Sequence, residues 1–265
     1  MSREPQKRGF GVAAGLPAEV CGPLAETCEE AGYDSLWSND HPGAKGLETL
    51  AEFAKVTDRL DLGVGVIALD RHSPEEVMAD IDRLGLDPAR LWIGLGAGFS
   101  KKPLTTMREA LPGIREALPG IRVVMAAMGP KMCALAGASY DGAFFNWMTA
   151  DFADRARENV EAGATEADRE APPVFGYVRT AIGDDAGERL AKEESFYRDL
   201  HEGYRSHFER LGEPEGTVGV AAPDPEDAQL QLDRFDALDV LVVRGLASAK
   251  VEPMCELARQ AAPIG

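Results

Sequence analysis

The sequence predicts a single domain in which eight parallel strands, each followed by a helix, close into a (β/α)8 TIM barrel. Two observations support this α/β fold class. The chain has 265 residues, which suits one barrel of roughly 250 residues. Short apolar runs alternate with segments of helical spacing, which is the pattern of parallel βαβ units. Eight right-handed units of this kind close naturally, and an open doubly wound sheet is the alternative.

The eight predicted strands are short apolar runs of the type found in strands buried on both faces. They cover residues 9–14, 35–38, 62–67, 91–95, 123–127, 142–147, 174–180 and 240–243. The helices expected between them cover residues 18–31, 47–59, 74–84 and 152–162. Gly32 and Gly163 are expected to end the first and the last of these helices, and Ser73 is expected to cap the third.

The longest segment between two predicted strands is residues 185–237, which we expect to form an extended helical insertion before the last strand. It contains charged helical pieces at residues 188–211 and 225–235. A long segment at the catalytic rim of a barrel often covers the ligand, and a simple surface helix is the alternative.

A seven-residue sequence occurs twice in tandem, at residues 108–114 and 115–121. Each copy ends in Pro-Gly-Ile, so Pro112-Gly113 and Pro119-Gly120 are expected to break or bend any helix there. We interpret the repeat as a local duplication in the link between the fourth and fifth strands.

The charge and the cysteines exclude several classes of function. The formal net charge is −17 and no stripe of Lys or Arg is present, so we expect no nucleic-acid partner. The four cysteines, Cys21, Cys28, Cys133 and Cys255, form no CxxC pair, which disfavours a metal site and indicates reduced thiols. No apolar run approaches ~18 residues and no signal peptide is apparent, so a cytoplasmic protein without a membrane partner is expected.

Polar residues follow the second and third predicted strands, and the carboxyl ends of strands supply the catalytic side chains of barrels. The second strand ends in Ser-Asn-Asp-His-Pro at residues 38–42, which suits a rim that orients a planar ligand and exchanges a proton. A capped turn is the alternative. The third strand carries Gly63 and Gly65, where a flat ring could approach closely. His72 and Ser73 follow it and fit a helix cap better than catalysis.

Two further strand ends are candidate anion sites. The fifth strand breaks at Gly129 and a helix follows with Pro130 in its first turn, so free backbone amides and Lys131 would favour a cofactor phosphate. Arg179 and Arg244 end the seventh and eighth strands. They would pair with local carboxylates such as Asp184 or Asp185, or bind an anionic substrate group.

Several of these motifs occur together in one order and spacing. They are residues 25–41, LGVGV at 62–66 with Arg71 and His72, residues 94–98, AAMGPKM at 126–132, residues 136–137 and DGAFFNW at 141–147. In this combination the chain resembles the luciferase-like flavin/F420-dependent oxidoreductases over nearly its whole length. Residues 219–224 and 238–244 are similar to the branch that includes F420-dependent methylenetetrahydromethanopterin reductases.

The resemblance implies a site for the deazaflavin coenzyme F420, with FMN as the alternative. Asp40 and His41 correspond to the pair that contacts the ring, and both are the candidate catalytic residues, His41 for handling a proton. Gly65 and Val66 correspond to a bulge with a non-prolyl cis peptide bond behind the ring. The implied cofactor-binding residues are Asp40, Gly65, Val66, Ala97, Ala127, Met128, Gly129, Pro130 and Lys131.

Two departures from the family pattern bear on the substrate. Phe99 stands where some sugar-phosphate dehydrogenases of the family have a catalytic carboxylate, and Ala97 stands where a hydroxyl is common, which disfavours that substrate class. The chain is also shorter than most relatives between the fourth and fifth strands.

The resulting hypothesis is an F420-dependent oxidoreductase that transfers a hydride to or from a small-molecule substrate. The alternatives are an FMN-dependent monooxygenase or reductase, and a cofactor-binding barrel without catalysis. The resemblance also implies a homodimer.

Overall fold

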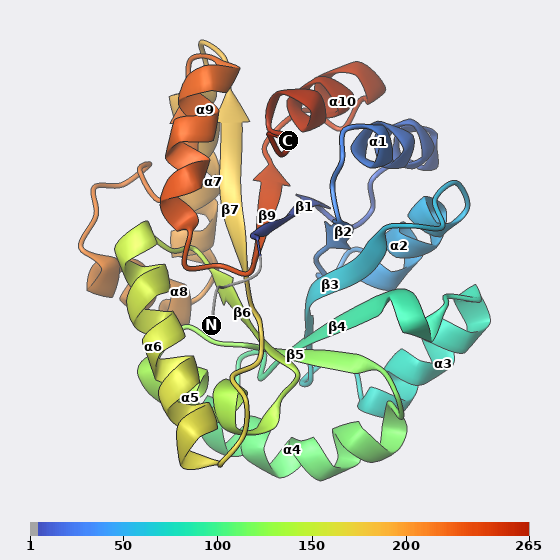
Figure 1. The fold of residues 1–265 in the computed structure, drawn as a ribbon, viewed down its shortest axis with the longest axis vertical. Helices are drawn as coiled ribbons and strands as arrows, with labels where there is room; N and C mark the ends of the chain where they lie inside the picture. Colours follow the sequence, from blue (N-terminus) through green and yellow to red (C-terminus); the bar gives the residue numbers. More distant parts are fainter. Residues whose placement is uncertain (1–4, 265) are drawn as a thin grey trace.

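The computed structural model describes residues 5–264, in which eight parallel strands form a closed barrel surrounded by helices (Figure 1). Around the barrel the strand order is β6-β5-β4-β3-β2-β1-β9-β7, and pairing of β6 with β7 closes the ring. The predicted barrel is therefore confirmed, and the open sheet is excluded. The barrel strands are β1 (Lys7–Val12), β2 (Ser35–Ser38), β3 (Asp61–Ala68), β4 (Leu91–Gly96), β5 (Arg122–Ala126), β6 (Gly142–Asn146), β7 (Val174–Ile182) and β9 (Val240–Gly245).

A ninth strand, β8 (Val220–Ala222), was not predicted. It pairs with the last three residues of β7, beyond the barrel wall. Its three residues are too few to give a periodic signal in the sequence.

Ten α-helices cover the described part of the barrel. They are α1 (Ala18–Glu30), α2 (Gly46–Ala54), α3 (Pro74–Leu84), α4 (Pro103–Ala117), α5 (Pro130–Ser139), α6 (Ala150–Glu166), α7 (Ala186–Leu200), α8 (Glu202–Leu211), α9 (Pro225–Leu232) and α10 (Val251–Gln260). Short 3-10 turns occupy Pro88–Arg90 and Asp233–Phe235. Ser73 caps α3 as predicted, because its Oγ accepts from Glu76 N and the Glu76 carboxylate accepts from Ser73 N.

Two predicted helix breaks are wrong. The helix α4 runs through Pro112-Gly113 and ends only before Pro119-Gly120. The φ that proline requires fits a helix, and burial of Met107 and Ile114 offsets the lost hydrogen bond. The helix α6 likewise continues past Gly163 to Glu166. Gly163 faces the backbone of Ala134 in α5, so this glycine permits close helix packing and does not end the helix.

Two other predicted helices have different bounds. The second ends at Ala54, five residues before the expected end at residue 59, and the Thr57 hydroxyl beyond it donates to Glu29 of α1 at 2.6 Å. The piece predicted at 188–211 is two helices, because His201 is extended and its side chain accepts from Gly203 N at the start of α8.

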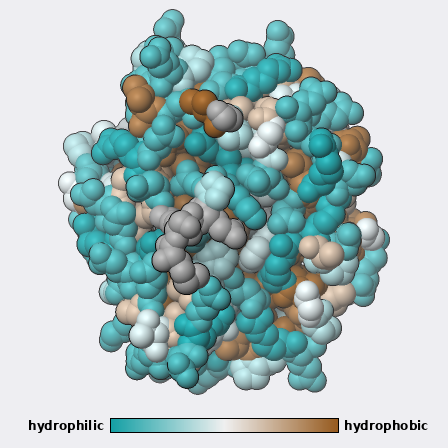
Figure 2. Space-filling view, in the orientation of Figure 1, coloured by the Kyte–Doolittle hydropathy of each residue, from teal (hydrophilic) through white to brown (hydrophobic). Residues whose placement is uncertain are grey.

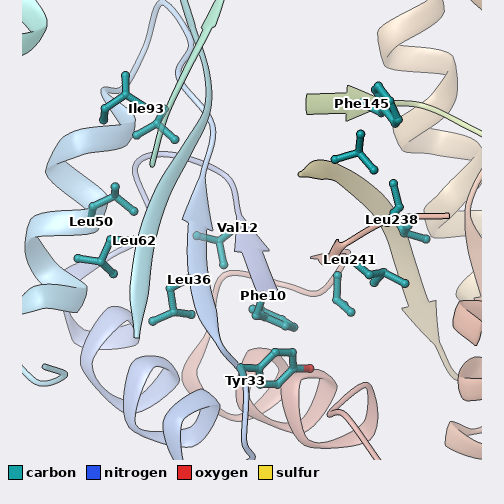
Figure 3. Packing of buried hydrophobic residues seen from close by; sticks show 14 of the residues in the cluster. Phe10, Val12, Tyr33, Leu36, Leu50, Leu62, Ile93, Phe145, Leu238 and Leu241 are labelled. Atoms are coloured by element: carbon teal, nitrogen blue, oxygen red, sulfur yellow. The ribbon is translucent and has the colours of Figure 1, made fainter. Parts of the chain in front are cut away.

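The buried side chains form two layers, one outside the strands and one inside the barrel. Figure 3 shows part of the outer layer, in which Phe10, Leu36 and Leu62 project from neighbouring strands toward the helices. The inner layer contains Trp37, Phe144, Phe175, Tyr177 and Val242. Large rings therefore fill the barrel interior.

The surface is mostly polar. On the face seen in Figure 2, hydrophilic residues dominate and apolar residues occur in small scattered groups, in keeping with the net charge of −17. Within residues 5–264, every helix is too short or too polar to cross a lipid bilayer.

Candidate functional site

The polar strand ends meet at one mouth of the barrel. Because all eight barrel strands are parallel, the segment after β2 and the turn after β5 lie at the same end of a closed barrel. This is the arrangement that a shared ligand site at the carboxyl ends of the strands requires.

Asp40 joins the loops after β2 and β3. Its side chain is only 3% exposed, and Oδ1 lies 3.0 Å from Arg71 Nη2 and 3.4 Å from His72 Nε2. Its Oδ2 accepts from the backbone N–H of Gly46 at 3.2 Å. The carboxylate is therefore held in one orientation by groups from two loops.

His41 lies beside Asp40 in the chain but is exposed to solvent. Its Nδ1 accepts from Gly43 N at 3.1 Å, and its Nε2 is 3.3 Å from the carbonyl oxygen of Ala14 after β1. With Nδ1 as an acceptor, Nε2 carries the hydrogen and donates to Ala14. The ring thus braces the β2 loop against the end of β1 while its edge stays accessible to water.

Arg71 and His72 contact Asp40, although the sequence analysis placed them in the family motif without predicting them as site residues. His72 was expected to help cap α3, but Ser73 alone makes the capping bonds and His72 contacts Asp40. The sequence contains a signal for this contact. Asp40 follows β2 and Arg71 follows β3, and the ends of neighbouring parallel strands meet at the same mouth of a barrel.

The third strand contains the bulge that the resemblance implies. The peptide bond between Gly65 and Val66 is cis, and the register of β3 against β4 shifts between Val64 and Ile67. Val66 turns inward and is half-buried at the mouth.

On the side where a Cβ would stand, Gly63 and Gly65 make room for aromatic side chains, and the close approach of a flat ring to this strand stays a prediction. A Cβ on Gly63 would clash with the Trp37 ring, and a Cβ on Gly65 would lie 2.7 Å from the Phe144 ring. The space beside these glycines is therefore filled by aromatic side chains of the barrel interior. The sequence could not show this, because a missing side chain looks the same whether a ligand or a neighbour uses the space.

The turn after β5 has the features of an anion site. The helix α5 begins at Pro130 with no side chain capping it, so the amides of its first turn stay free of side-chain partners. Gly129 is the residue before it, and a Cβ there would meet nothing within 4 Å. Lys131 is exposed beside it, whereas Met128 is half-buried and Ala127 is buried.

The loop after β4 forms another edge of the mouth. Ala97 is buried, and Phe99 N donates to the Asp70 carboxylate at 2.9 Å. Phe99 is 54% exposed and stacks on His201 with ring centroids 4.5 Å apart. This contact links the loop to the junction of α7 and α8.

Arg179 and Arg244 lie inside the barrel near its mouth, and the expectation that they pair with Asp184 or Asp185 is wrong. Asp185 pairs with Arg189 at 2.8 Å. No ion pair within residues 5–264 includes Arg179 or Arg244. Both side chains point inward, because they share a strand face with Tyr177 and Val242 of the inner layer.

The helices α7 and α8 cover this side of the mouth with a small apolar cluster of their own. Trp147, Leu190, Phe208 and Val218 form its centre, and Tyr197 and Tyr204 pack against it. The segment between β7 and β9 is thus a roof over the two arginines. In this structure it is more than a surface helix.

His207 makes the roof sensitive to acid. The ring is fully buried, its Nε2 is 2.6 Å from the carbonyl oxygen of Trp147, and its Nδ1 has no partner among the described residues. Burial lowers the pKa of His207 below its ordinary value of 6.5, Arg210 lowers it further, and the bond to Trp147 opposes both effects.

We therefore expect the protein to lose stability as the pH falls below about 6.5, the ordinary pKa of histidine. Above that pH the ring is neutral in the folded and unfolded states, and the stability is complete. Below it the unfolded chain binds a proton that folded His207 resists, at a cost of at most about 1.4 kcal/mol per pH unit. Thermal unfolding of wild type and His207→Gln between pH 8 and 5 checks this. As the pH falls, the Tm of wild type should fall more than the Tm of His207→Gln. An equal fall in both proteins would contradict the role of His207.

The fold is a (β/α)8 barrel whose polar strand ends meet at one mouth, the end at which barrels of this kind hold their ligands. The sequence model of the luciferase-like monooxygenase family matches residues 14–118 and 109–253, and the chain belongs to this family. Its members are F420- or flavin-dependent oxidoreductases. The two matched segments overlap at residues 109–118, within the tandem repeat.

One relative is similar in sequence over part of the chain. The 5,10-methylenetetrahydromethanopterin reductase of Methanolobus tindarius is 27% identical over 201 residues, a match that covers 62% of this chain and 62% of that reductase. This chain therefore matches less than two thirds of that relative's length.

Solved structures share the fold at low identity. An F420-dependent secondary alcohol dehydrogenase in complex with an F420–acetone adduct has a TM-score of 0.75 at 16% identity, over 96% of this chain and 97% of that one. The coenzyme F420-dependent tetrahydromethanopterin reductase from Methanopyrus kandleri has a TM-score of 0.75 at 17% identity, over 97% of both chains. The oxygenating constituent of 3,6-diketocamphane monooxygenase from Pseudomonas putida, in complex with FMN, has a TM-score of 0.68 at 13% identity, over 97% of both chains.

Proposed function

We propose that this protein is a coenzyme F420-dependent oxidoreductase that transfers a hydride between the deazaflavin and a small organic substrate. One observation carries the proposal. The β3 bulge at Gly65–Val66 and the uncapped start of α5 lie at the same barrel mouth, beside a buried, oriented carboxylate on Asp40. A flat ring and a phosphate-bearing tail need these two kinds of surface.

Small side chains stand at the mouth on the strands that the cofactor would contact. Ala13 and Ala126 continue the inward-facing rows of β1 and β5, yet Ala13 is exposed and Ala126 only half-buried. These small, partly exposed side chains would not obstruct a ring at this mouth. Exposed Lys131 supplies local positive charge in a protein whose net charge would otherwise repel an anionic cofactor.

When bound, the deazaflavin supplies the carbon that accepts or gives the hydride. The residues of this chain bind and orient the cofactor, and they exchange a proton. Asp40 orients the polar edge of the ring, since Arg71 and Gly46 fix its carboxylate. His41 moves the proton, because its ring is exposed at the mouth and Nε2 carries a hydrogen. The roof of α7 and α8 excludes water from the β7 side.

The choice of F420 over FMN is supported by the curated reductase and by the two structures whose names include F420. FMN remains the second candidate, because a monooxygenase of the same fold was solved with FMN. The two cofactors differ in their visible absorbance, so one experiment distinguishes the two candidates.

The test is a titration of the purified full chain with F420 and, separately, with FMN, followed by absorbance and fluorescence. We expect F420 to bind with a Kd in the micromolar range or below, and FMN at least tenfold more weakly, which is about 1.4 kcal/mol. Ala126→Trp should abolish binding because it fills the mouth, whereas Ala79→Trp, on the exposed face of α3, should not change it.

Each other outcome has a definite meaning. Tighter binding of FMN than of F420 would favour the flavin enzyme. A folded protein that binds neither cofactor would support the barrel without catalysis and overturn the proposal. Unchanged binding in Ala126→Trp would place the cofactor elsewhere.

A further inference from the structure

We propose that Arg179 and Arg244 form a substrate subsite for an oxyanion, so that the substrate of the proposed oxidoreductase is an organic acid or a phosphate ester. Only the identification of the bound oxyanion as a substrate rests on the proposed function. The subsite itself is argued from the two arginines and their surroundings.

The two guanidinium groups are neighbours in a buried place. Arg179 on β7 pairs in register with Arg244 on β9, and both side chains extend from the inner face of the barrel. Arg179 is 2% exposed and Arg244 is 6% exposed. Two like charges side by side in a poorly solvated position repel each other unless an anion lies between them.

The protein supplies almost no partners for these groups. A guanidinium has five N–H donors. Arg179 donates one hydrogen bond, to Asn146 Oδ1, and its buried Nε has no partner among the described residues. Arg244 donates one, to the carbonyl oxygen of Gly245 at 3.3 Å. The remaining donors are free for a ligand.

Other shielded arginines of the chain are treated differently. Most have a carboxylate within ion-pair distance, as Arg8 has with Asp233, Arg71 with Asp40, Arg122 with Asp61, Arg157 with Asp239 and Arg198 with Glu194. Half-buried Arg90 has none, but it donates three hydrogen bonds to the carbonyl oxygens of Leu60 and Thr57. The acidic residue that acts on Arg179 is Glu193 in α7, which forms no ion pair with it. Burial and, to a smaller extent, the charge of Arg244 lower the pKa of Arg179, and Tyr197, Glu193 and Tyr204 only partly oppose this. Among the shielded arginines of residues 5–264, Arg179 and Arg244 thus lack both a carboxylate partner and the several carbonyl acceptors that Arg90 has.

Aromatic rings complete the walls of the subsite. The Arg179 guanidinium lies 4.1 Å from the Trp147 ring centroid, 5.0 Å from that of Tyr197 and 5.7 Å from that of Tyr177. Ring faces stabilise a cation without neutralising it, and they leave the N–H edge of the guanidinium available. The rings therefore orient the arginine for bidentate contact with a carboxylate or phosphate.

The position fits a substrate better than the cofactor. In the ring of eight strands, β7 lies opposite β3, so Arg179 faces the bulge at Val66 across the barrel. A ring packed on that bulge would turn its free side toward the arginines. The uncapped start of α5 is a separate anion site, because β6 lies between β5 and β7.

The test uses the protein without cofactor and two probes, sodium propionate and inorganic phosphate, with sodium chloride at matched ionic strength as the reference. We expect a saturable rise in Tm with at least one probe in the wild type, and a rise in the Kd of that probe of at least tenfold in Arg179→Met and in Arg244→Met. Arg122→Gln, which removes an inward-facing but paired arginine at the opposite mouth, should keep the wild-type response.

The same variants are then titrated with F420. We expect affinities within about threefold of wild type. A loss of F420 affinity that parallels the loss of probe binding would show that the pair binds the cofactor, and would overturn the proposal. The absence of a Tm rise with both probes in wild type would overturn it too. If the wild type binds a probe but no F420, the proposed function fails and the oxyanion site stands. We expect Arg179→Met and Arg244→Met to fold, because an apolar side chain replaces a buried charge that has no partner of opposite charge.

Discussion

Replacing Gly163 with alanine is expected to destabilise the protein by about 1–3 kcal/mol, although alanine is the better helix former. A Cβ at residue 163 would meet the carbonyl group of Ala134, with the carbonyl carbon 2.6 Å away. The contact is reciprocal, since a Cβ on Gly137 in α5 would lie 2.8 Å from the carbonyl carbon of Val160 in α6. Backbone atoms cannot rotate aside, so the two helices would have to separate.

Urea denaturation of Gly163→Ala and Gly113→Ala measures this effect against a matched control. Gly113 is also inside a helix, α4, but a Cβ there meets nothing within 4 Å. That variant should therefore gain about 0.5–1 kcal/mol from helix propensity. If both variants gained stability, the close approach of α5 and α6 would be refuted.

The packing of α5 against α6 also matters for the proposed site. The free amides that would hold a cofactor phosphate belong to the first turn of α5, and Gly137 lies two turns further along the same helix. A shift of α5 would move these amides relative to the β3 bulge. Gly163→Ala should therefore weaken F420 binding even where the protein is still folded.

The barrel was predictable because its signal is repeated. Each of the eight strands is an apolar run, and local errors in helix ends do not change their number or direction. The errors arose where one residue type serves two purposes. Gly163 was predicted to end a helix, yet it makes room for α5, and the sequence did not show that Gly63 makes room for the Trp37 ring. Only the fold identifies that neighbour.

The site was predictable in position but not in detail. Parallel strands place the residues after β2 and β5 at one mouth, whatever their side chains do. The partners of those side chains depend on the paths of loops. Asp40 contacts Arg71 and His72, and Arg179 contacts no carboxylate although Asp184 and Asp185 follow it closely in the chain. Proximity in sequence predicted the wrong partner in the second case.

Replacing Asp40 with asparagine is expected to have the largest effect on function of any conservative change at the mouth. The side chain keeps its shape and one acceptor oxygen, so the contact with Gly46 N can persist. The charge that pairs with Arg71 is lost, and the buried Arg71 Nε already lacks a partner among the described residues. We expect a loss of about 1–3 kcal/mol in stability and at least a tenfold loss in F420 affinity.

The double variant Asp40→Asn/Arg71→Met separates the two contributions. Removing both charges leaves neither group unpaired, so the free energy of unfolding should return toward the wild-type value. F420 affinity should stay low, because Asp40 is proposed to contact the ring itself and not only to anchor Arg71. Recovery of both stability and F420 affinity in the double variant would instead make Asp40 a positioning residue for the two loops, and the ring contact would then have to come from another group at the mouth.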